Sequence, residues 1–300
     1  MFERHEPAFP LSIVSVLACF AGGGGIFSVS QASPPGNDIA GVGTTARQCE
    51  QHRPRLEVDS MRARRRKYRG GSSKLLKWSL TVVAAVVAVS VMLVLVLRWV
   101  PPPTSAFMLQ HVLQQRGSSQ AVPLRHRWVP LESMSAYAPA AVVAAEDQLF
   151  YHHRGFDFEA LRQAWAHNQA GGAVRGGSTI TQQTAKNLFL WPARSLFRKG
   201  VEAYFAVLIE ALWPKQRIVE VYLNIAQFGD GIYGVGAASE AFFGKPAAEL
   251  TAYEAALLAA VLPNPVRLRV DQPSAYVLQR RDWIARQMWQ LEAHGYLPSY

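Results

Sequence analysis

The chain has 300 residues, half of them hydrophobic, which is enough for one substantial core and a further segment. Its two cysteines, Cys19 and Cys49, both lie near the N-terminus, so the rest of the chain has no disulfide framework and no thiolate metal site. The formal net charge is +10, but eight of the basic residues lie between Met61 and Lys77, where no acidic residue occurs. The remaining charge of about +2 is ordinary for a soluble domain. The basic balance is therefore local, and it argues against nucleic acid as a partner.

Residues 1–60 carry little structural signal. The apolar run Leu11 to Ala21 is short and is followed by four glycines, and much of the remainder is polar and rich in Gly, Ser and Pro. This composition is typical of a disordered extension. Because Met61 begins the basic run directly, the alternative is that translation starts near Met61 and residues 1–60 are a mis-called extension.

Residues 79–98 are predicted to form one transmembrane helix. Ser79 to Leu97 are nineteen residues without a charge, and a helix of that length spans a hydrocarbon core of about 30 Å. The basic segment 61–78 precedes it, so the positive-inside rule places that segment in the cytoplasm and the rest of the chain outside. A cleaved signal peptide is the alternative, but the run is long for one and no small-x-small site precedes Pro101 to Pro103.

Residues 126–300 are predicted to be mostly α-helical, after a linker or interfacial segment at 99–125. Apolar residues recur at helical spacing, and alternating strand patterns are nearly absent. Asp157 is placed to cap one helix, and Pro214 and Pro263 are placed to interrupt others. The predicted apolar helix segments are 158–165, 197–212, 218–225, 254–262 and 277–291. Glycines at 171–172, 176–177 and 229–236 mark loops, where binding groups tend to lie.

One of these helices carries a polar face. Thr179, Gln182, Gln183 and Lys186 recur at i, i+3, i+4 and i+7, which places them on one side of a helix, opposite the more apolar face. The helix is entered through glycines, so its free N–H groups and this face together predict an anion site. The alternative is the solvated face of an amphipathic helix.

Two glutamates are candidates for acid–base chemistry. Glu146 follows an apolar run, so we expect it to be partly buried at a helix end, where burial raises the pKa of a carboxylate and makes it a better base. Glu202 lies four residues after Arg198 and three after Lys199, a spacing that keeps it ionised. Two carboxylates in different environments are typical of glycosyl-transfer sites. For Glu202 the alternative is an exposed helix ion pair.

Five segments together carry a family resemblance. The segments are Glu146 to Asp157 (EDQLFYHHRGFD), Gly176 to Asn187 (GGSTITQQTAKN), Arg198 to Glu202, Lys215 to Asn224, and Ala255 to Pro265. In this order they resemble the five motifs of the peptidoglycan glycosyltransferases (glycosyltransferase family 51), which include the biosynthetic transglycosylases and the polymerase domain of penicillin-binding proteins. Val219 departs from the pattern, since leucine is usual there.

The resemblance implies a fold and a reaction. The fold is a lysozyme-like helical domain with a small flexible lobe against the membrane. Glu146 would be the general base that deprotonates the 4-hydroxyl of the acceptor lipid II. That oxygen would attack the anomeric carbon of the growing chain and invert it to a β-1,4 linkage, and undecaprenyl diphosphate would leave.

The resemblance also implies residue roles. Lys186 and Arg194, with Arg198 nearby, would stabilise the diphosphate, and Glu202 would orient the acceptor or these cations. No organic cofactor is implied, and a divalent ion such as Mg²⁺ is a candidate. The remaining substrate-binding candidates are Asp147, Phe150, His153, Ser178, Thr179, Gln182, Gln183, Asn187 and Lys199.

The implied partners are lipid II, the lipid-linked glycan chain, the membrane and other proteins of wall synthesis or division. The resemblance places the protein in the bacterial cytoplasmic membrane, with a cytoplasmic N-terminus and a periplasmic catalytic domain. No Ser-x-x-Lys, Ser-x-Asn or Lys-Thr-Gly pattern of a transpeptidase occurs, so penicillin binding is not expected. A membrane-tethered muramidase or lytic transglycosylase is the rival enzyme, although it would not need the three cations. A non-catalytic scaffold is the other rival.

Overall fold

The computed structural model describes residues 56–117, 121–169, 176–193 and 195–297, with side chains from Lys74 onward. The chain divides into two compact units, Met1–Arg65 and Arg66–Tyr300, and the second contains nearly everything described below. The expected disorder of residues 1–55 lies outside the described residues.

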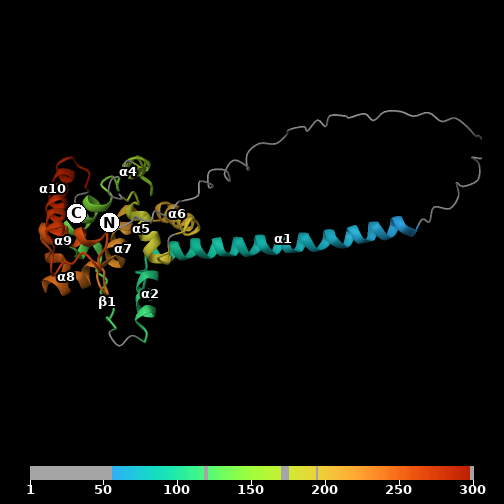
Figure 1. Cartoon of the computed structure of the whole chain (residues 1–300), viewed down its shortest axis with the longest axis horizontal. Coiled ribbons are helices and arrows are strands. Elements are labelled where there is room, and N and C mark those ends of the chain that lie inside the picture. The colour runs from blue at the N-terminus through green and yellow to red at the C-terminus, as the bar shows by residue number, and fades with distance from the viewer. Residues whose placement is uncertain (1–55, 118–120, 170–175, 194, 298–300) are drawn as a thin grey trace, which may run out of the picture. The chain divides into compact units, whose positions relative to one another are not determined.

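The second unit is mainly helical, as the sequence predicts (Figure 1). The helices are α1 (Leu56–Leu97), α2 (Ala106–Gln115), α3 (Tyr137–Glu146), α4 (Phe158–Gln169), α5 (Ile180–Phe189), α6 (Leu196–Leu212), α7 (Lys215–Ile225), α8 (Val235–Phe243), α9 (Ala252–Val261) and α10 (Ala275–Ala293). Two 3₁₀ turns, η1 (Leu131–Ser133) and η2 (Ala247–Glu249), and three strands, β1 (Arg125–His126), β2 (Gln227–Gly229) and β3 (Ile232–Tyr233), complete the described elements.

Helix α1 contains the predicted transmembrane segment. Within it, Lys74–Leu97 is the one described helix that is long and apolar enough to cross a membrane, by length and composition. Large apolar side chains along it, such as Trp78, Val82 and Val86, are exposed, as expected of a helix that faces lipid. The helix also covers the basic segment and residues 56–60, which we predicted to belong to the disordered extension. No Gly or Pro interrupts residues 56–69, so nothing local ends the helix there.

The last turns of α1 are bonded to α6 and α7. The indole Nε1 of Trp213 donates to the carbonyl of Val94 at 2.7 Å, and Arg217 donates through Nη2 to the carbonyls of Leu97 and Val100, both at 2.9 Å. The final carbonyls of a helix have no partner within the helix, so these bonds cap α1. The end of the predicted membrane helix is thereby part of the packed helical unit.

The segment 99–125, predicted as a linker or interfacial segment, contains the ordered helix α2. The hydroxyl of Ser105 accepts from the backbone N–H of Met108 at 3.2 Å and caps α2 at its N-terminus. Met108 and His111 are buried, and α2 packs against α5. Its other face, which includes Leu109 and Leu113, is exposed. The segment is therefore more than a linker.

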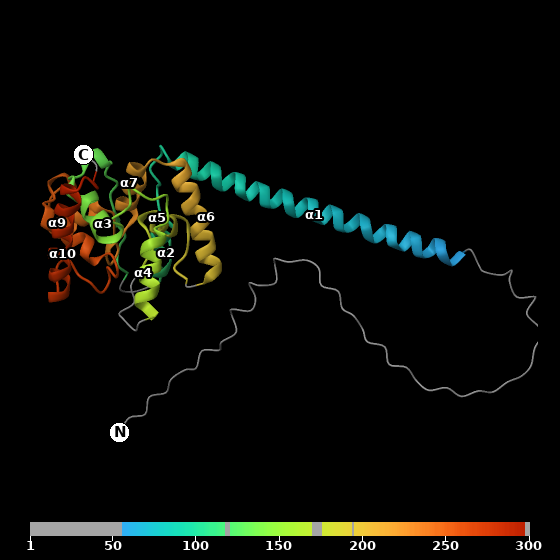
Figure 2. The ribbon, with the colours of Figure 1, turned by 90° about the horizontal axis from the view of Figure 1, so that it is seen from above.

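Two alanine-rich helices form the centre of the core. Helix α3 packs against α9 and α10 on one side and against α7 on the other, and α5 packs against α6 and α7 (Figure 2). The facing surfaces of α3 and α9 carry small buried side chains such as Ala141, Ala144, Ala256 and Ala259, which let two helices approach closely. The sequence predictions for α9 and for the buried face of α10 are confirmed. This packing places the C-terminal end of α3, where Glu146 lies, at the centre of the unit.

The sequence pattern did not predict the small sheet. Its strand order is β1-β3-β2, with β1 parallel and β2 antiparallel to β3. Strands of two or three residues are too short to show alternation. The backbone of Gly234, which follows β3, has φ +82°, and a Cβ there would lie 2.7 Å from the carbonyl oxygen of Asn224. Only glycine fits this crossing of β3 and α7.

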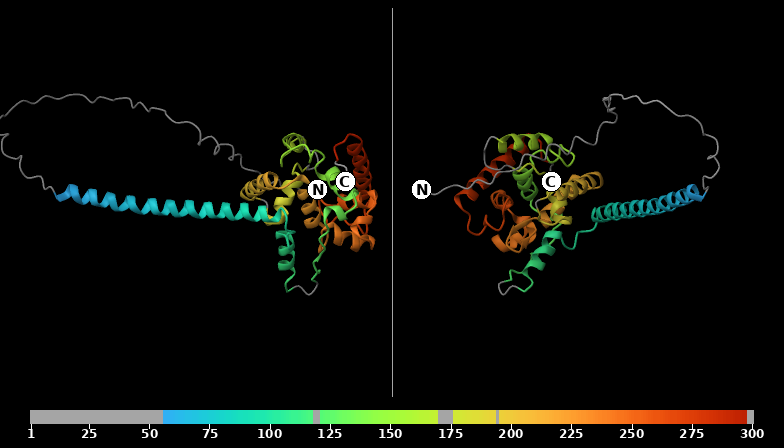
Figure 3. Two further views of the ribbon diagram at one scale, coloured as in Figure 1. Left: turned by 180° about the vertical axis from the view of Figure 1, so that it is seen from behind. Right: turned by 45° about the vertical axis from the view of Figure 1, so that its right-hand side comes forward.

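Helix α4 begins as predicted but faces the other way. The carboxylate of Asp157 accepts from the backbone N–H of Ala160 at 2.8 Å, so the predicted N-cap is confirmed. The apolar stripe of Phe158, Leu161 and Trp165 is exposed and does not pack into the core. Figure 3 shows α4 at the margin of the helical unit. Periodicity predicted the helix correctly, but it could not tell which surface covers the stripe.

Asn224 provides a test of this packing. Its side chain is buried, accepts from the N–H of Val129 and donates to the carbonyl of Val129, each at 2.8 Å. Asn224→Leu removes both bonds and leaves two buried backbone groups unpaired, so we expect it to lower the free energy of unfolding by about 3 kcal/mol. Thermal unfolding of the detergent-solubilised protein measures this. The exposed Asn264→Ala is the control and should cost less than about 1 kcal/mol. Equal losses in the two variants would contradict the assignment.

Candidate active site

Glu146 is the last residue of α3 and lies almost buried in the floor of a cleft. Its carboxylate oxygen Oε2 accepts from Nε2 of Gln183 at 2.9 Å, and Oε1 accepts from Nη2 of Arg280 at 3.4 Å. Burial raises the pKa of Glu146, while Gln183, Arg280 and Lys186 oppose that rise. The prediction of a partly buried carboxylate with a raised pKa is confirmed.

A buried tyrosine orients the amide of Gln183. The hydroxyl of Tyr222, on α7, donates to Oε1 of Gln183 at 3.2 Å, which leaves the amide NH₂ to face Glu146. Burial raises the pKa of Tyr222 well above its ordinary value, so the hydroxyl keeps its proton and remains a donor. The amide of Gln183 is therefore fixed from behind by α7.

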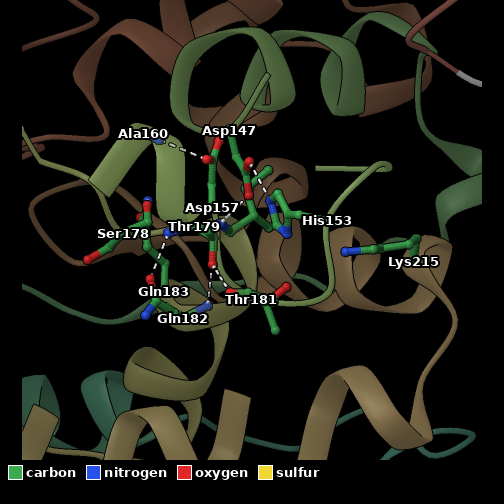
Figure 4. A network of polar contacts seen from close by, with 12 residues as sticks. Asp147, His153, Asp157, Ala160, Ser178, Thr179, Thr181, Gln182, Gln183 and Lys215 are labelled. Carbon is green, nitrogen blue, oxygen red and sulfur yellow. Dashed lines mark hydrogen bonds and ion pairs between the residues drawn. The ribbon is translucent and has the colours of Figure 1, made fainter. Parts of the chain in front are cut away.

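Asp147 links the end of α3 to the start of α5. Its Oδ1 accepts from Nε2 of His153 at 2.8 Å, and its Oδ2 accepts from the backbone N–H of Ile180 at 3.0 Å (Figure 4). A carboxylate at a helix N-terminus also interacts favourably with the helix dipole. The sequence predicted free N–H groups here for a bound anion. That prediction is wrong for Ile180, because Asp147 already occupies the position.

Thr179 and Gln182 form the N-cap of α5. The N–H of Gln182 donates to Oγ1 of Thr179 at 3.2 Å, and the N–H of Thr179 donates to Oε1 of Gln182 at 3.0 Å, a capping box. The Thr179 hydroxyl donates to the carbonyl of Gly155 at 2.7 Å (Figure 4). Both side chains are buried. Of the predicted polar face, Gln183 and Lys186 are less buried, as is the neighbouring Asn187.

Glu202 is the centre of a buried ion cluster on α6. Its Oε2 lies 2.6 Å from Nη1 of Arg198, its Oε1 contacts Nζ of Lys199, and its side chain is only 2% exposed. The alternative of an exposed ion pair is therefore wrong for Glu202. Lys199 also donates to Oγ of Ser178 at 3.1 Å, which ties α6 to the loop before α5.

Lys186 lies between the two glutamates. Burial lowers the pKa of Lys186; the charges of Arg198 and Lys199 lower it further, and those of Glu202 and Glu146 oppose the shift. Nε of Arg198 is buried and has no hydrogen-bond partner among the described residues. Arg198 and Lys199 are paired with Glu202, and the charge of Lys186 also interacts with that of Glu202. This local excess of positive charge is suited to an anionic group of a substrate.

A cleft of about 890 Å³ opens beside Glu146. It is lined by residues of α3, α4 and α10 and of the loop before α5, including Gln183, Arg280 and Trp283. The aromatic and amide side chains suit a sugar. Glu146 lines this cleft, and its charge also acts on Lys186.

Three further residues were predicted to belong to the site: Phe150, His153 and Arg194. Phe150 is fully buried, with Nζ of Lys215 4.4 Å from its ring centroid, so it supports the site from behind. His153 is bonded to Asp147, as described above. Arg194 lies outside the described residues.

Sequence reasoning missed Arg280. Val277, Ile284, Met288 and Leu291 form the buried face of α10, and Arg280 stands three residues after Val277 and four before Ile284. A charge within an apolar stripe was the signal that could have found it.

The described residues do not form a metal cage. Among them there is no group of three or more His, Cys, Asp or Glu side chains that could hold an ion. Both oxygens of Glu202 already contact cations. These residues do not fit a protein-held divalent ion.

Comparison with known proteins places the chain in a family. Residues 112–289 match the family described as Transglycosylase. The chain belongs to this transglycosylase family. A protein named biosynthetic peptidoglycan transglycosylase from Stutzerimonas stutzeri (strain A1501) is 50% identical over 225 residues, which is 75% of this chain and 90% of the relative.

Two further relatives bear the same name. One, from Pseudomonas putida (strain ATCC 700007), is 51% identical over 211 residues, 70% of this chain and 89% of the relative. The other, from Xanthomonas campestris pv. campestris (strain B100), is 50% identical over 225 residues, 75% of this chain and 92% of the relative. The match therefore extends beyond the five motifs to most of the transglycosylase.

The raised pKa of Glu146 makes a prediction about stability. The folded protein favours the protonated carboxyl, so Glu146 contributes stability below its unfolded pKa and loses it as pH rises through the folded pKa. We expect Glu146→Gln to melt at a higher temperature than wild type at neutral pH, with the difference vanishing below the ordinary glutamate pKa of ~4.3. Thermal unfolding at both pH values measures this. A lower melting temperature for the variant at neutral pH would contradict the assignment.

Proposed function

We propose that this transglycosylase polymerises lipid II into β-1,4-linked glycan strands, with inversion at the anomeric carbon and release of undecaprenyl diphosphate. The observation that carries the proposal is one wall of the site, where a carboxylate of raised pKa adjoins a cluster of cations. The name of the relatives, biosynthetic peptidoglycan transglycosylase, supports the same reaction class.

Glu146 acts as the general base in this proposal. It takes the proton of the acceptor 4-hydroxyl as that oxygen bonds to the anomeric carbon of the growing chain. A base is most effective when its pKa approaches the working pH, and burial moves Glu146 in that direction. Each carboxylate oxygen of Glu146 accepts one hydrogen bond, Oε2 from Gln183 and Oε1 from Arg280. Lone pairs therefore remain to accept the proton of the acceptor hydroxyl.

Lys186 and Arg198 act on the leaving group. The bond between the anomeric carbon and the diphosphate oxygen breaks as the new bond forms, and negative charge develops on the diphosphate. Lys186 and Arg198 belong to a cluster that carries more positive charge than its single carboxylate neutralises. Glu202 holds the cations of α6 in place. Preorganised cations of this kind supply several kcal/mol of transition-state stabilisation.

A lytic transglycosylase is the weaker alternative. It also needs a carboxylic acid, but no diphosphate leaves in its reaction, so the cation cluster would have no role. We propose that a divalent ion such as Mg²⁺ would enter with the substrate diphosphate, because Mg²⁺ needs few protein ligands.

The membrane anchor supports a lipid-linked substrate. We propose that the basic segment before Lys74–Leu97 lies in the cytoplasm and that the helical unit after it lies in the periplasm, following the positive-inside rule. Both substrates carry polyprenyl tails, so an enzyme bonded to the end of its own anchor meets them at the membrane surface. Binding of other wall-synthesis proteins is compatible with this arrangement.

The first test of the proposed function is polymerisation of purified lipid II by the detergent-solubilised protein. We expect wild type to make glycan strands, and we expect Glu146→Gln to lose at least 10²-fold in rate, because loss of a general base commonly costs 10²–10⁴-fold. Glu240→Gln, which breaks an exposed pair with Arg127, is the matched control and should keep full activity. Polymer at equal rates from Glu146→Gln and wild type would discard Glu146 as the base.

Lys186 provides the second test. Lys186→Gln keeps a polar side chain, one atom shorter, but removes its charge, so we expect kcat to fall by roughly 10²-fold as the leaving diphosphate loses a cation. Lys245→Gln, which breaks an ion pair with Glu254, is the control. A change in KM alone, with kcat preserved, would show that Lys186 binds the ground state and does not act on the leaving group.

A further inference from the structure

Arg280 is a mostly buried charge that lines the cleft beside the apolar face of α10. It lies on the buried face of α10, in line with Val277 and Ile284, and its side chain is only 22% exposed. A charge placed there is costly unless it is well paired. Within the described part of the chain it makes one hydrogen bond, the long 3.4 Å contact to Glu146, and its Nε is buried without a partner. Stability alone does not explain this arginine.

The carboxylate of Glu146 is held from two sides. Gln183, on α5, donates to Oε2, and Arg280, on α10, donates to Oε1. Tyr222 fixes the amide from α7, so three different helices determine where the carboxylate lies. Arg280 lines the cleft beside Glu146, whereas Lys186 is grouped with the cations around Glu202.

We propose that Arg280 is a positioning residue for the base, which orients the Glu146 carboxylate toward the cleft and remains its counter-charge when substrate is bound. The proposal rests on the proposed function, since it assigns a role within the same reaction. Among the described residues, four titratable side chains act on Glu146. They are Asp147 from its own segment, Lys186 from α5, the neutral Tyr222 from α7 and Arg280 from α10.

Once the diphosphate is bound, Arg280 becomes the main counter-charge of the Glu146 carboxylate. Among the described residues, Lys186 is the other cation whose charge lowers the pKa of Glu146, and in the proposed reaction it pairs with the diphosphate. That pairing cancels the positive charge that Lys186 presents to Glu146. Arg280 lies on the other side of the carboxylate and keeps its charge. It therefore opposes the rise in the pKa of Glu146 that burial and Asp147 cause, at the moment when the base has to be ionised.

Gln287 provides a matched control on the same helix. It lies two turns beyond Arg280 on α10, and its Oε1 accepts from Nε2 of Gln148 at 3.1 Å. Gln148 follows Glu146 closely in sequence, so Gln287 also ties α10 to the end of α3. Gln287→Ala loosens this packing without touching the carboxylate of Glu146.

The experiment compares the pH dependence of kcat, which reports the enzyme with substrate bound, for lipid II polymerisation in wild type, Arg280→Gln, Arg280→Lys and Gln287→Ala. Removing the positive charge raises the pKa of Glu146. We therefore expect the acidic limb of the pH–rate profile to lie about one pH unit higher in Arg280→Gln than in wild type. The loss should be about 10-fold at acid pH and should shrink as pH rises. Arg280→Lys should return the acidic limb most of the way to its wild-type position, and Gln287→Ala should leave that position unchanged.

A second readout does not depend on turnover. The infrared carboxyl band that is present in wild type and absent in Glu146→Gln is titrated in wild type and in Arg280→Gln, each without substrate. An upward shift of its midpoint in Arg280→Gln supports the proposal even if wild type fails to polymerise lipid II, an outcome that would overturn only the proposed function. The role of Arg280 would be overturned if the midpoint in Arg280→Gln stays at its wild-type value and the variant either keeps its full rate or loses rate equally at every pH.

Discussion

The carboxylate of Asp147 connects the two helix ends from which the site is built. One oxygen holds His153 in the loop after α3, and the other accepts the N–H of Ile180 at the start of α5. Because Asp147 is adjacent to Glu146, this bond sets the distance from the base to the residues of α5. The capping box of Thr179 and Gln182 then orients α5 so that Gln183 reaches the carboxylate of Glu146. Asp147, Thr179 and Gln182 thus have structural roles, because they hold their neighbours Glu146 and Gln183 in position.

Glu146 and the cation cluster show opposite uses of burial. Burial raises the pKa of Glu146, which makes a carboxylate a better base. Burial lowers the pKa of Lys186, and the neighbouring cations act in the same direction. Both effects destabilise the ionised forms in the folded protein. A site of this kind is sustained by the surrounding core, here the alanine-rich packing of α3 against α9 and the buried face of α10.

The end of α1 is joined to the catalytic helices by hydrogen bonds rather than by a free linker. Trp213 and Arg217, from the junction of α6 and α7, bond to its last carbonyls, and Arg98 donates to the carbonyl of Leu212 at 2.7 Å. Helix α6 also carries Glu202 and its cations. The candidate membrane span and the helix proposed to bind the leaving group therefore share one packing arrangement, which suits the proposed reaction between two lipid-linked substrates.

The sequence by itself determined what depends on contacts between near neighbours. It predicted the apolar span in α1, the cap at Asp157, the breaks at Pro214 and Pro263, and the contacts of Glu202 with Arg198 and Lys199, because helical spacing alone brings residues three or four apart together. The tertiary structure decided which faces are covered. It turned Thr179 and Gln182 inward, left the stripe of α4 exposed, paired β1 with β3, and brought Arg280 to Glu146 across 134 positions in the chain. Periodicity defines a face, but only packing between distant segments determines what lies against it.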